Sequence, residues 1–329
     1  MTKENFLYKK IIRPALFLTD AEKAHDVAVF FLKSAKLLPF KKNIFSLFFK
    51  ESEQEKEILG IKFKNPLGLA AGFDKNAEIY PILALMGFGF IEIGTITYKA
   101  QPGNPKPRLF RYPQNCAIVN RMGFNNCGAV QAAKNIEKNG KISVPLGISI
   151  GKNSDCPIEE APKNYEESFK ILSPYGDFFT INVSCPNIKN LSLLHAPQYL
   201  ERIFSSFRNI AGEKPFFLKI APNLSDNDLE QVISVCLKYK AGVIASNTLP
   251  AKQAGYQEEG GLSGRPLAML SLNMISRVRK ISKDIPLISS GGIFDKKDFN
   301  NRLSEGANLA QIYTALIYEG PSVIKNILS

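Results

Sequence analysis

Polar residues stand at or near the ends of eight apolar runs of this sequence, at positions where a simple hydrophobic core would not place them. They are Asp74-Lys75, Thr95, Ser149, Asn182, Lys219, Ser246-Asn247-Thr248, Gly291-Gly292 and Tyr313-Thr314. Any one of them also fits an ordinary turn, because Asn and Gly are common turn residues. Eight in series instead predict one ligand site. Its amide and ammonium donors favour binding a ring rich in amide and carboxylate groups over hydrolysis.

Two glycine-rich turns late in the chain predict what else that ligand carries. Gly260-Gly-Leu-Ser-Gly264 and Ser289-Ser-Gly-Gly292 offer backbone N–H groups that can hold a phosphate. Lys75 and Lys219 would face an electron-rich ring or an anion. A planar cofactor with a phosphate, such as flavin mononucleotide (FMN), suits this combination. Each turn taken alone also fits a simple reversal of the chain.

The elements that must position these residues form a regular series from about residue 58. Apolar, β-rich runs occur at 66–71, 90–95, 145–150, 178–183, 215–220, 242–247, 285–290 and 309–313, and helical patterns follow, for example at 78–86, 126–138, 158–172, 225–239 and 266–280. No two runs are close enough for a hairpin, which predicts a parallel sheet. Eight strand–helix units close a barrel, so the expected α/β fold is a (β/α)8 TIM barrel. Its sites form at the carboxyl ends of the strands.

Residues 1–50 differ from the rest and are predicted to form a helical extension of the barrel domain at 51–329. They hold ten Lys or Arg and four acids, a net +6 of the +12 of the whole chain. Apolar residues at steps of three and four predict helices at 4–17, 20–37 and 41–50. Such helices either pack on the barrel or lie in a membrane surface, with Phe and Leu in lipid and Lys and Arg at anionic headgroups. Composition does not separate these two arrangements.

Composition excludes several other classes of protein. The 329 residues are 45% hydrophobic and 22% charged, as in a globular protein with a large core. No apolar stretch approaches the roughly 18 residues of a spanning helix, and the N-terminus lacks a secretory signal. Five scattered cysteines without a Cys-x-x-Cys pair indicate a reduced chain without structural zinc. Two histidines without carboxylate clusters beside them argue against a catalytic metal.

Seven motifs, in this order, resemble those of the dihydroorotate dehydrogenases. They are Gly68-Leu-Ala-Ala-Gly-Phe-Asp-Lys75, Ile91-Glu-Ile-Gly-Thr95, Gln101-Pro-Gly-Asn-Pro-Lys-Pro-Arg-Leu-Phe-Arg111, Asn120-Arg-Met-Gly-Phe-Asn-Asn126, Asn182-Val-Ser-Cys-Pro-Asn187, Gly260-Gly-Leu-Ser-Gly-Arg-Pro266 and Gln311-Ile-Tyr-Thr314. The basic extension, with its Ala24-His25, is similar to that of the membrane-associated, quinone-reducing class. The resemblance implies an FMN-dependent barrel enzyme that oxidises (S)-dihydroorotate to orotate in pyrimidine biosynthesis, with a quinone as electron acceptor.

The resemblance also implies the roles of individual residues. FMN would be held by Ala71, Gly72, Phe73, Asp74, Lys75, Thr95, Ser149, Asn182, Lys219, Ser246, Gly264, Gly292, Tyr313 and Thr314. The substrate would be held by Lys75, Asn120, Arg121, Met122, Gly123, Phe124, Asn182, Asn187, Asn247 and Thr248. His25 and Arg111 would line the route to the quinone, and no metal is implied.

Cys185 is the expected catalytic base. Forming the C5–C6 double bond requires removal of a C5 proton while the C6 hydride leaves to the flavin, and a residue on the loop after the fourth strand can take that proton. The membrane-associated class usually carries Ser there, whereas the soluble class carries Cys. An unperturbed thiol has a pKa near ~8.5, so Cys185 should be the easier base. Ser149 in place of the family's common Asn, and Ser246 in place of Thr, are two further departures.

The electron acceptor is predicted from the extension. A basic, apolar extension favours an acceptor dissolved in lipid. The expected location is peripheral, on the cytoplasmic side of a bacterial inner membrane, because no transit peptide is evident. The expected oligomeric state is a monomer. Removing residues 1–50 is then expected to abolish quinone turnover and to spare flavin reduction. The alternatives are a soluble-type dihydroorotate dehydrogenase using fumarate or NAD, a flavoenzyme similar to the tRNA dihydrouridine synthases, and a non-catalytic protein that binds membranes or nucleic acid. The charge is concentrated in the extension, which argues against a nucleic-acid partner.

Overall fold

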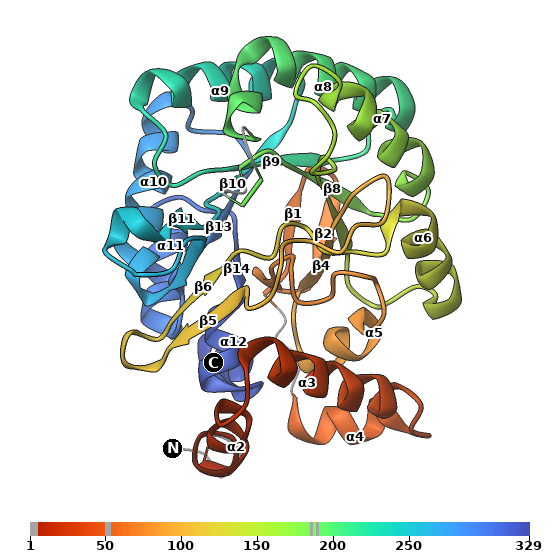
Figure 1. Ribbon diagram of the computed structural model, residues 1–329, viewed down its shortest axis with the longest axis vertical. Coiled ribbons are helices and arrows are strands. Elements are labelled where there is room, and N and C mark those ends of the chain that lie inside the picture. Colours follow the sequence, from red (N-terminus) through yellow and green to blue (C-terminus); the bar gives the residue numbers. More distant parts are fainter. Residues whose placement is uncertain (1–5, 50–53, 185–186, 189–190) are drawn as a thin grey trace.

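The computed structural model describes residues 6–49, 54–184, 187–188 and 191–329. Eight parallel strands close a barrel in the order β3-β4-β7-β8-β9-β10-β13-β14, and helices surround it (Figure 1). The strands are β3 (Leu67–Leu69), β4 (Phe90–Ile96), β7 (Leu146–Ile150), β8 (Phe178–Asn182), β9 (Phe216–Ile220), β10 (Gly242–Ala245), β13 (Leu287–Ser290) and β14 (Leu309–Ile312). Each overlaps one predicted run, so the predicted TIM barrel is confirmed.

The inside of the barrel changes from apolar to polar along the strands. Alternate side chains of a strand point to the same face, and here one set points into the barrel. The first inward level is an apolar layer of Phe90, Phe178, Phe217, Ile244, Ile288 and Leu309. Phe63 covers this layer, with its ring edge-on to Phe90 at 5.3 Å. Buried polar residues such as Glu92, Thr180 and Lys219 follow two positions later on the same strands. The barrel is therefore solid at the amino ends of its strands and polar towards their carboxyl ends.

Amphipathic helices cover the outside of the barrel. They are α5 (Tyr80–Leu83), α6 (Gly128–Asn139), α7 (Ala161–Leu172), α8 (Pro197–Ala211), α9 (Asp226–Lys238), α10 (Ala268–Ile281), α11 (Lys296–Ser304), α12 (Thr314–Glu319) and α13 (Ser322–Leu328). In α8 the buried residues Leu200, Ile203, Phe204 and Phe207 recur at the spacing of one helix face. Helix α9 begins after Ser225, whose side chain accepts the N–H of the third helical residue. The helices predicted from periodicity are confirmed at these positions.

Short antiparallel strands outside the eight predicted runs were not predicted from the sequence. β1 (Lys56–Ile58) pairs with β2 (Ile61–Phe63), whose Phe63 packs on the apolar layer of the barrel. β5 (Leu109–Tyr112) and β6 (Ala117–Asn120) join β11 (Leu249–Pro250) and β12 (Gly261–Gly264) in a four-stranded sheet. These strands have two to four residues, too few to show the alternation that marks a half-buried strand. The four-stranded sheet matters for function, because it brings β6 and β12 over the carboxyl ends of the barrel strands.

The extension packs at one side of the barrel, beside α5 and α12 (Figure 1). A π-helical turn (Tyr8–Ile12) leads into α2 (Arg13–Phe17), followed by α3 (Ala21–Lys36) and α4 (Lys41–Phe48). The helices predicted at 20–37 and 41–50 are confirmed within a residue or two of their ends, whereas the first five residues lie outside the described part. None of the helices in the described residues is long and apolar enough to cross a bilayer. The domain division at residue 50 stays a prediction.

Candidate active site

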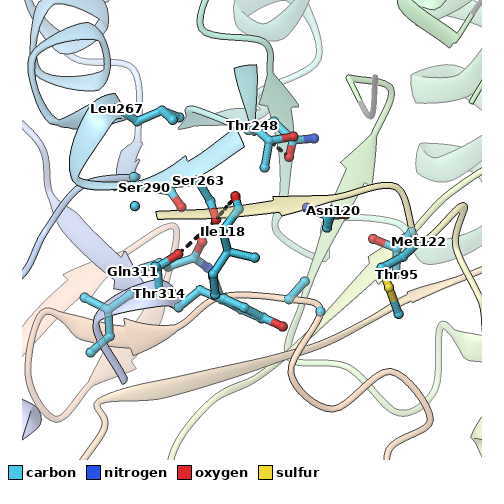
Figure 2. Close-up of a pocket in the computed structure, with 18 of the residues that line it drawn as sticks. Thr95, Ile118, Asn120, Met122, Thr248, Ser263, Leu267, Ser290, Gln311 and Thr314 are labelled. Carbon is cyan, nitrogen blue, oxygen red and sulfur yellow. Dashed lines mark hydrogen bonds between the residues drawn. The ribbon is translucent and has the colours of Figure 1, made fainter. Parts of the chain in front are cut away.

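A cavity at the carboxyl ends of the barrel strands brings most of the predicted site residues together (Figure 2). From the predicted cofactor set it is lined by Ala71, Gly72, Lys75, Thr95, Asn182, Lys219, Ser246, Gly264, Gly292, Tyr313 and Thr314. From the predicted substrate set it is lined by Asn120, Met122, Gly123, Phe124, Asn182, Asn187, Asn247 and Thr248, as well as Lys75. Residues far apart in the sequence, on β6, β8 and β9 and directly after β10 and β14, therefore converge on one space.

Three predicted cofactor residues do not line this cavity with their side chains. The Asp74 carboxylate accepts the backbone N–H groups of Glu78, Ile79 and Tyr80 at 2.7–2.8 Å, so it fixes the loop after β3 instead. The Ser149 hydroxyl lies 2.9 Å from that of Thr95 and supports a residue that does line the cavity. Phe73 belongs to the wall of a second cavity, described below.

Arg121, from the predicted substrate set, does not line the cavity. Arg121 donates to the carbonyl oxygen of Pro107 at 2.9 Å and lies over the Phe110 ring, so its guanidinium points away from the cavity. Its backbone nevertheless continues β6 towards Met122. Cys185 lies outside the described residues. Its role as the base therefore stays a prediction.

Amide side chains at the cavity form a cluster of two hydrogen-bonded pairs. Asn182 donates to Thr95 Oγ1 at 3.0 Å, and its Oδ1 accepts from Asn247 Nδ2 at 3.1 Å. The same Nδ2 donates to Ser184 Oγ at 2.9 Å. On the other wall, Asn187 donates to Asn120 Oδ1 at 3.2 Å. Four asparagines from β8, β6 and two loops are thus oriented by one another, which preorganises donors and acceptors for a small polar ring.

The Gly291-Gly292 turn lines the cavity, and the carbonyl group of Gly291 is hydrogen-bonded to residues outside it. Gly291 carbonyl oxygen accepts from Ser271 Oγ at 2.7 Å and Arg302 Nη2 at 3.2 Å, and neither of these residues lines the cavity. Both glycines have positive φ, and a Cβ on Gly292 would lie 2.4 Å from Ala268 Cα. Glycine is therefore required there, and the carbonyl is held away from the cavity. Such a turn suits a phosphate.

The opposite end of the cavity is electropositive. The Lys75 pKa is lowered to about 8, mainly by burial; the Glu22 carboxylate opposes this shift and the nearby Arg108 guanidinium adds to it. Lys219 extends from β9 into the same space and is 6% exposed. Partly desolvated ammonium groups attract anions and electron-rich rings. The donor set from Lys75 to the glycine turn therefore fits FMN together with an anionic substrate. Among the described residues, no group of His, Cys, Asp and Glu side chains is placed to hold a metal.

A second, apolar cavity of about 650 Å³ lies between the extension and the barrel. Helices α2 and α3 supply much of its wall, and four residues line both cavities: His25, Leu109, Ile118 and Tyr313. Burial, together with the Lys75 charge, lowers the His25 pKa to about 3, so its imidazole is neutral. Its ring meets Phe73 edge-on at 5.2 Å. The structure thus joins a polar site to an apolar chamber at a neutral histidine.

Arg111, the other residue predicted for the quinone route, also lines this apolar chamber. Its guanidinium lies 4.4 Å from the centre of the Phe17 ring and donates to the Leu16 carbonyl at 3.1 Å. Arg111 therefore satisfies carbonyl groups at the end of α2 as well as facing the cavity.

Several lining residues of the polar cavity were missed by sequence reasoning. Glu22, Ser263, Ser290 and Gln311 all line it. Ser263 accepts a hydrogen bond from Thr314 at 2.9 Å, which ties β12 to the end of β14 (Figure 2). Ser290 and Gln311 lay inside motifs already singled out, and inward alternation along a strand would have found them. Glu22 had no such signal.

Comparison with known proteins agrees with this geometry. The family model for dihydroorotate dehydrogenase matches residues 54–329. A dihydroorotate dehydrogenase (quinone) from Christiangramia forsetii is 43% identical over 98% of this chain and 97% of its own. One from Paraburkholderia phymatum is 39% identical over 95% and 94%. The crystal structure of DHODH from Eimeria tenella in complex with ferulenol has a TM-score of 0.83 at 34% identity, covering 93% of this chain and 89% of that one.

Proposed function

This chain belongs to the dihydroorotate dehydrogenase family and is a quinone-dependent oxidoreductase of pyrimidine biosynthesis, and we propose that it works with FMN held across the mouth of its barrel. The observation that carries this proposal is the single cavity that runs from the Gly291-Gly292 turn to Lys75 and the asparagine cluster. The glycine turn would hold the phosphate, and Lys75 and Lys219 the ring system. When bound, FMN supplies the acceptor for the hydride from substrate C6.

The asparagine cluster would bind dihydroorotate and orotate. Asn120, Asn182, Asn187 and Asn247 offer both donors and acceptors, which match the alternating amide N–H and C=O groups of a pyrimidine ring. Lys75 would add the positive charge that the substrate carboxylate requires. Because the amides are already hydrogen-bonded to one another and to Thr95 or Ser184, little rotamer freedom remains to be lost on binding.

Cys185 would take the C5 proton from the substrate. Its described neighbours support this assignment: Ser184 Oγ donates to the Lys219 carbonyl at 2.7 Å, and Asn187 contacts Asn120. The residues on either side of Cys185 and Pro186 in the sequence, Ser184 and Asn187, are therefore both hydrogen-bonded at the proposed substrate site. An unperturbed thiol has a pKa near ~8.5, so it loses its proton far more easily than a serine hydroxyl does.

The apolar chamber would receive the quinone, and the extension would rest on the membrane. Of the seventeen large apolar side chains exposed among the described residues, twelve lie within residues 6–44, including Phe30, Phe31, Leu37 and Phe40. Apolar side chains interleaved with Lys and Arg suit the surface of an anionic bilayer. This arrangement supports a peripheral location on the cytoplasmic face of a bacterial inner membrane.

The acceptor is tested by steady-state turnover of dihydroorotate with ubiquinone and menaquinone analogues, fumarate and NAD. We expect turnover with a quinone and none with fumarate or NAD; the reverse pattern would contradict the quinone route. Flotation with vesicles that contain anionic lipid tests the membrane contact, and loss of flotation at high salt is expected. The monomeric state stays a prediction that light scattering can check.

A further inference from the structure

The extension contacts the substrate side of the molecule through one buried carboxylate. Glu22 lies in the first turn of α3, where the Asp20 side chain accepts its backbone N–H. Glu22 is 7% exposed and accepts Arg108 Nη2 at 2.8 Å and Nε at 3.1 Å, one bond to each carboxylate oxygen. Arg108 is also 7% exposed. Lys106 adds a third, more exposed partner at 3.2 Å. A bidentate, buried pair of this kind fixes both side chains in one geometry.

The remaining nitrogen of the Arg108 guanidinium binds the loop 102–104, which precedes Arg108 in the sequence. Its Nη1 donates to the carbonyl oxygens of Pro102 at 2.6 Å and of Asn104 at 2.8 Å. This loop in turn holds the segment from Asn120 to Phe124. The Asn104 N–H donates to the Met122 carbonyl at 3.0 Å, and its Nδ2 donates to the Arg121 carbonyl at 2.9 Å.

The loop and the substrate segment are packed too closely to move independently. A Cβ on Gly103 would lie 2.2 Å from the Met122 carbonyl oxygen, and a Cβ on Gly123 would lie 2.8 Å from the Asn104 side chain. The Arg121 N–H also donates to the Arg108 carbonyl at 2.8 Å. A shift of Arg108 therefore moves the backbone that presents Asn120, Met122 and Phe124 to the cavity.

We propose that Glu22 is a positioning residue of the substrate site: through Arg108 it fixes the loop that sets the Asn120–Phe124 segment against dihydroorotate. The proposal rests on the placement of substrate proposed above. Glu22 also lines the same cavity as Lys75, so its carboxylate balances charge there. The extension thus has a second task besides forming the apolar chamber, namely completing the substrate site.

This role changes what truncation should do. Removing residues 1–50 deletes Glu22 and leaves the Arg108 guanidinium buried without its carboxylate partner, which is unfavourable. The truncated protein should therefore bind orotate more weakly, in addition to losing quinone turnover. The expectation from sequence, that truncation spares flavin reduction, stays a prediction, and weaker orotate binding is expected in addition.

The test is the variant Glu22→Gln in the full-length, FMN-loaded protein, with orotate affinity measured by calorimetry. Gln keeps the shape and loses the charge, and we expect the Kd for orotate to rise by about tenfold or more while FMN content stays the same. Lys33→Gln is the matched control. It removes another bridge from α3 to the barrel, the 2.7 Å contact with Glu78, which does not reach the substrate segment. Its orotate affinity should equal that of the unmodified protein.

A double-mutant cycle with Arg108→Lys shows whether the pair acts as a unit. Lys keeps the charge and loses the bidentate geometry, so the double variant should be little worse than either single one. An unchanged Kd in Glu22→Gln, an equal weakening in Lys33→Gln, or additive effects in the cycle would each overturn the proposal. If Glu22→Gln lost FMN, the Kd for orotate of Arg108→Lys would test the proposal instead: a weaker affinity would support it and an unchanged one would overturn it. Failure of the unmodified protein to bind orotate would instead refute the proposed function.

Discussion

Lys75 gives the substrate site a pH dependence that can be calculated. Its pKa is lowered to about 8 by burial, with Arg108 adding to the shift and Glu22 opposing it. With a pKa near 8, the ammonium is roughly nine-tenths charged at pH 7 and roughly one-tenth charged at pH 9. Orotate is an anion and is bound by the charged form. The Kd for orotate should therefore rise about tenfold between pH 7 and pH 9, with half of the charge lost near pH 8.

The assay is titration of the FMN-loaded protein with orotate, followed by the change in flavin absorbance at each pH. Lys75→Gln should bind orotate weakly at pH 7 and show no such rise. In Glu22→Gln the midpoint should move to lower pH, because the carboxylate that favours the charged lysine is gone. Lys33→Gln should follow the unmodified protein. An orotate affinity that is constant from pH 7 to pH 9 in the unmodified protein would refute this reasoning.

Three further predictions concern the base, the apolar chamber and the apolar layer inside the barrel. Cys185→Ala should abolish bleaching of the flavin by dihydroorotate while keeping FMN bound, and Cys185→Ser should shift the rise in rate to higher pH; rapid-mixing absorbance checks both. Ala28 faces the apolar chamber, so Ala28→Phe should raise the KM for quinone in steady-state assays and leave flavin bleaching unchanged. Phe178 is fully buried in the apolar layer inside the barrel, at the amino ends of its strands, so Phe178→Ala should cost about 3–5 kcal/mol in chemical denaturation without changing the Kd for orotate. A quinone KM in Ala28→Phe equal to that of the unmodified protein would contradict the second prediction, and an unchanged stability in Phe178→Ala would contradict the third.

The barrel could be predicted because its signal is local. Each of the eight strands is a short apolar run followed by a helical pattern, and both periodicities are visible within about 30 residues. The β5–β6 hairpin was missed because its strands have only four residues each, too few to show alternation. This hairpin is stabilised by tertiary contacts, such as the pairing of β12 with β6, and not by the local preferences of its own sequence.

Most residues of the site could be predicted from the sequence, but the directions in which their side chains point could not. Asp74 and Ser149 were expected to face the cofactor because of their types and positions, yet their side chains bond to the protein itself. Whether a loop side chain points inwards depends on the backbone dihedrals of that loop, which the sequence does not display. Glu22 could not be found at all, because its partner Arg108 lies 86 residues away and the pair forms only when α3 docks.

The central claim is that one cavity holds flavin and dihydroorotate together and passes electrons to a quinone in the neighbouring chamber. Anaerobic mixing of the purified yellow protein with dihydroorotate, followed by a quinone analogue, tests it most directly. The account predicts that dihydroorotate bleaches the flavin absorbance within the turnover time and that the quinone restores it. A flavin band that dihydroorotate leaves unchanged, or that fumarate restores and quinone does not, would contradict it.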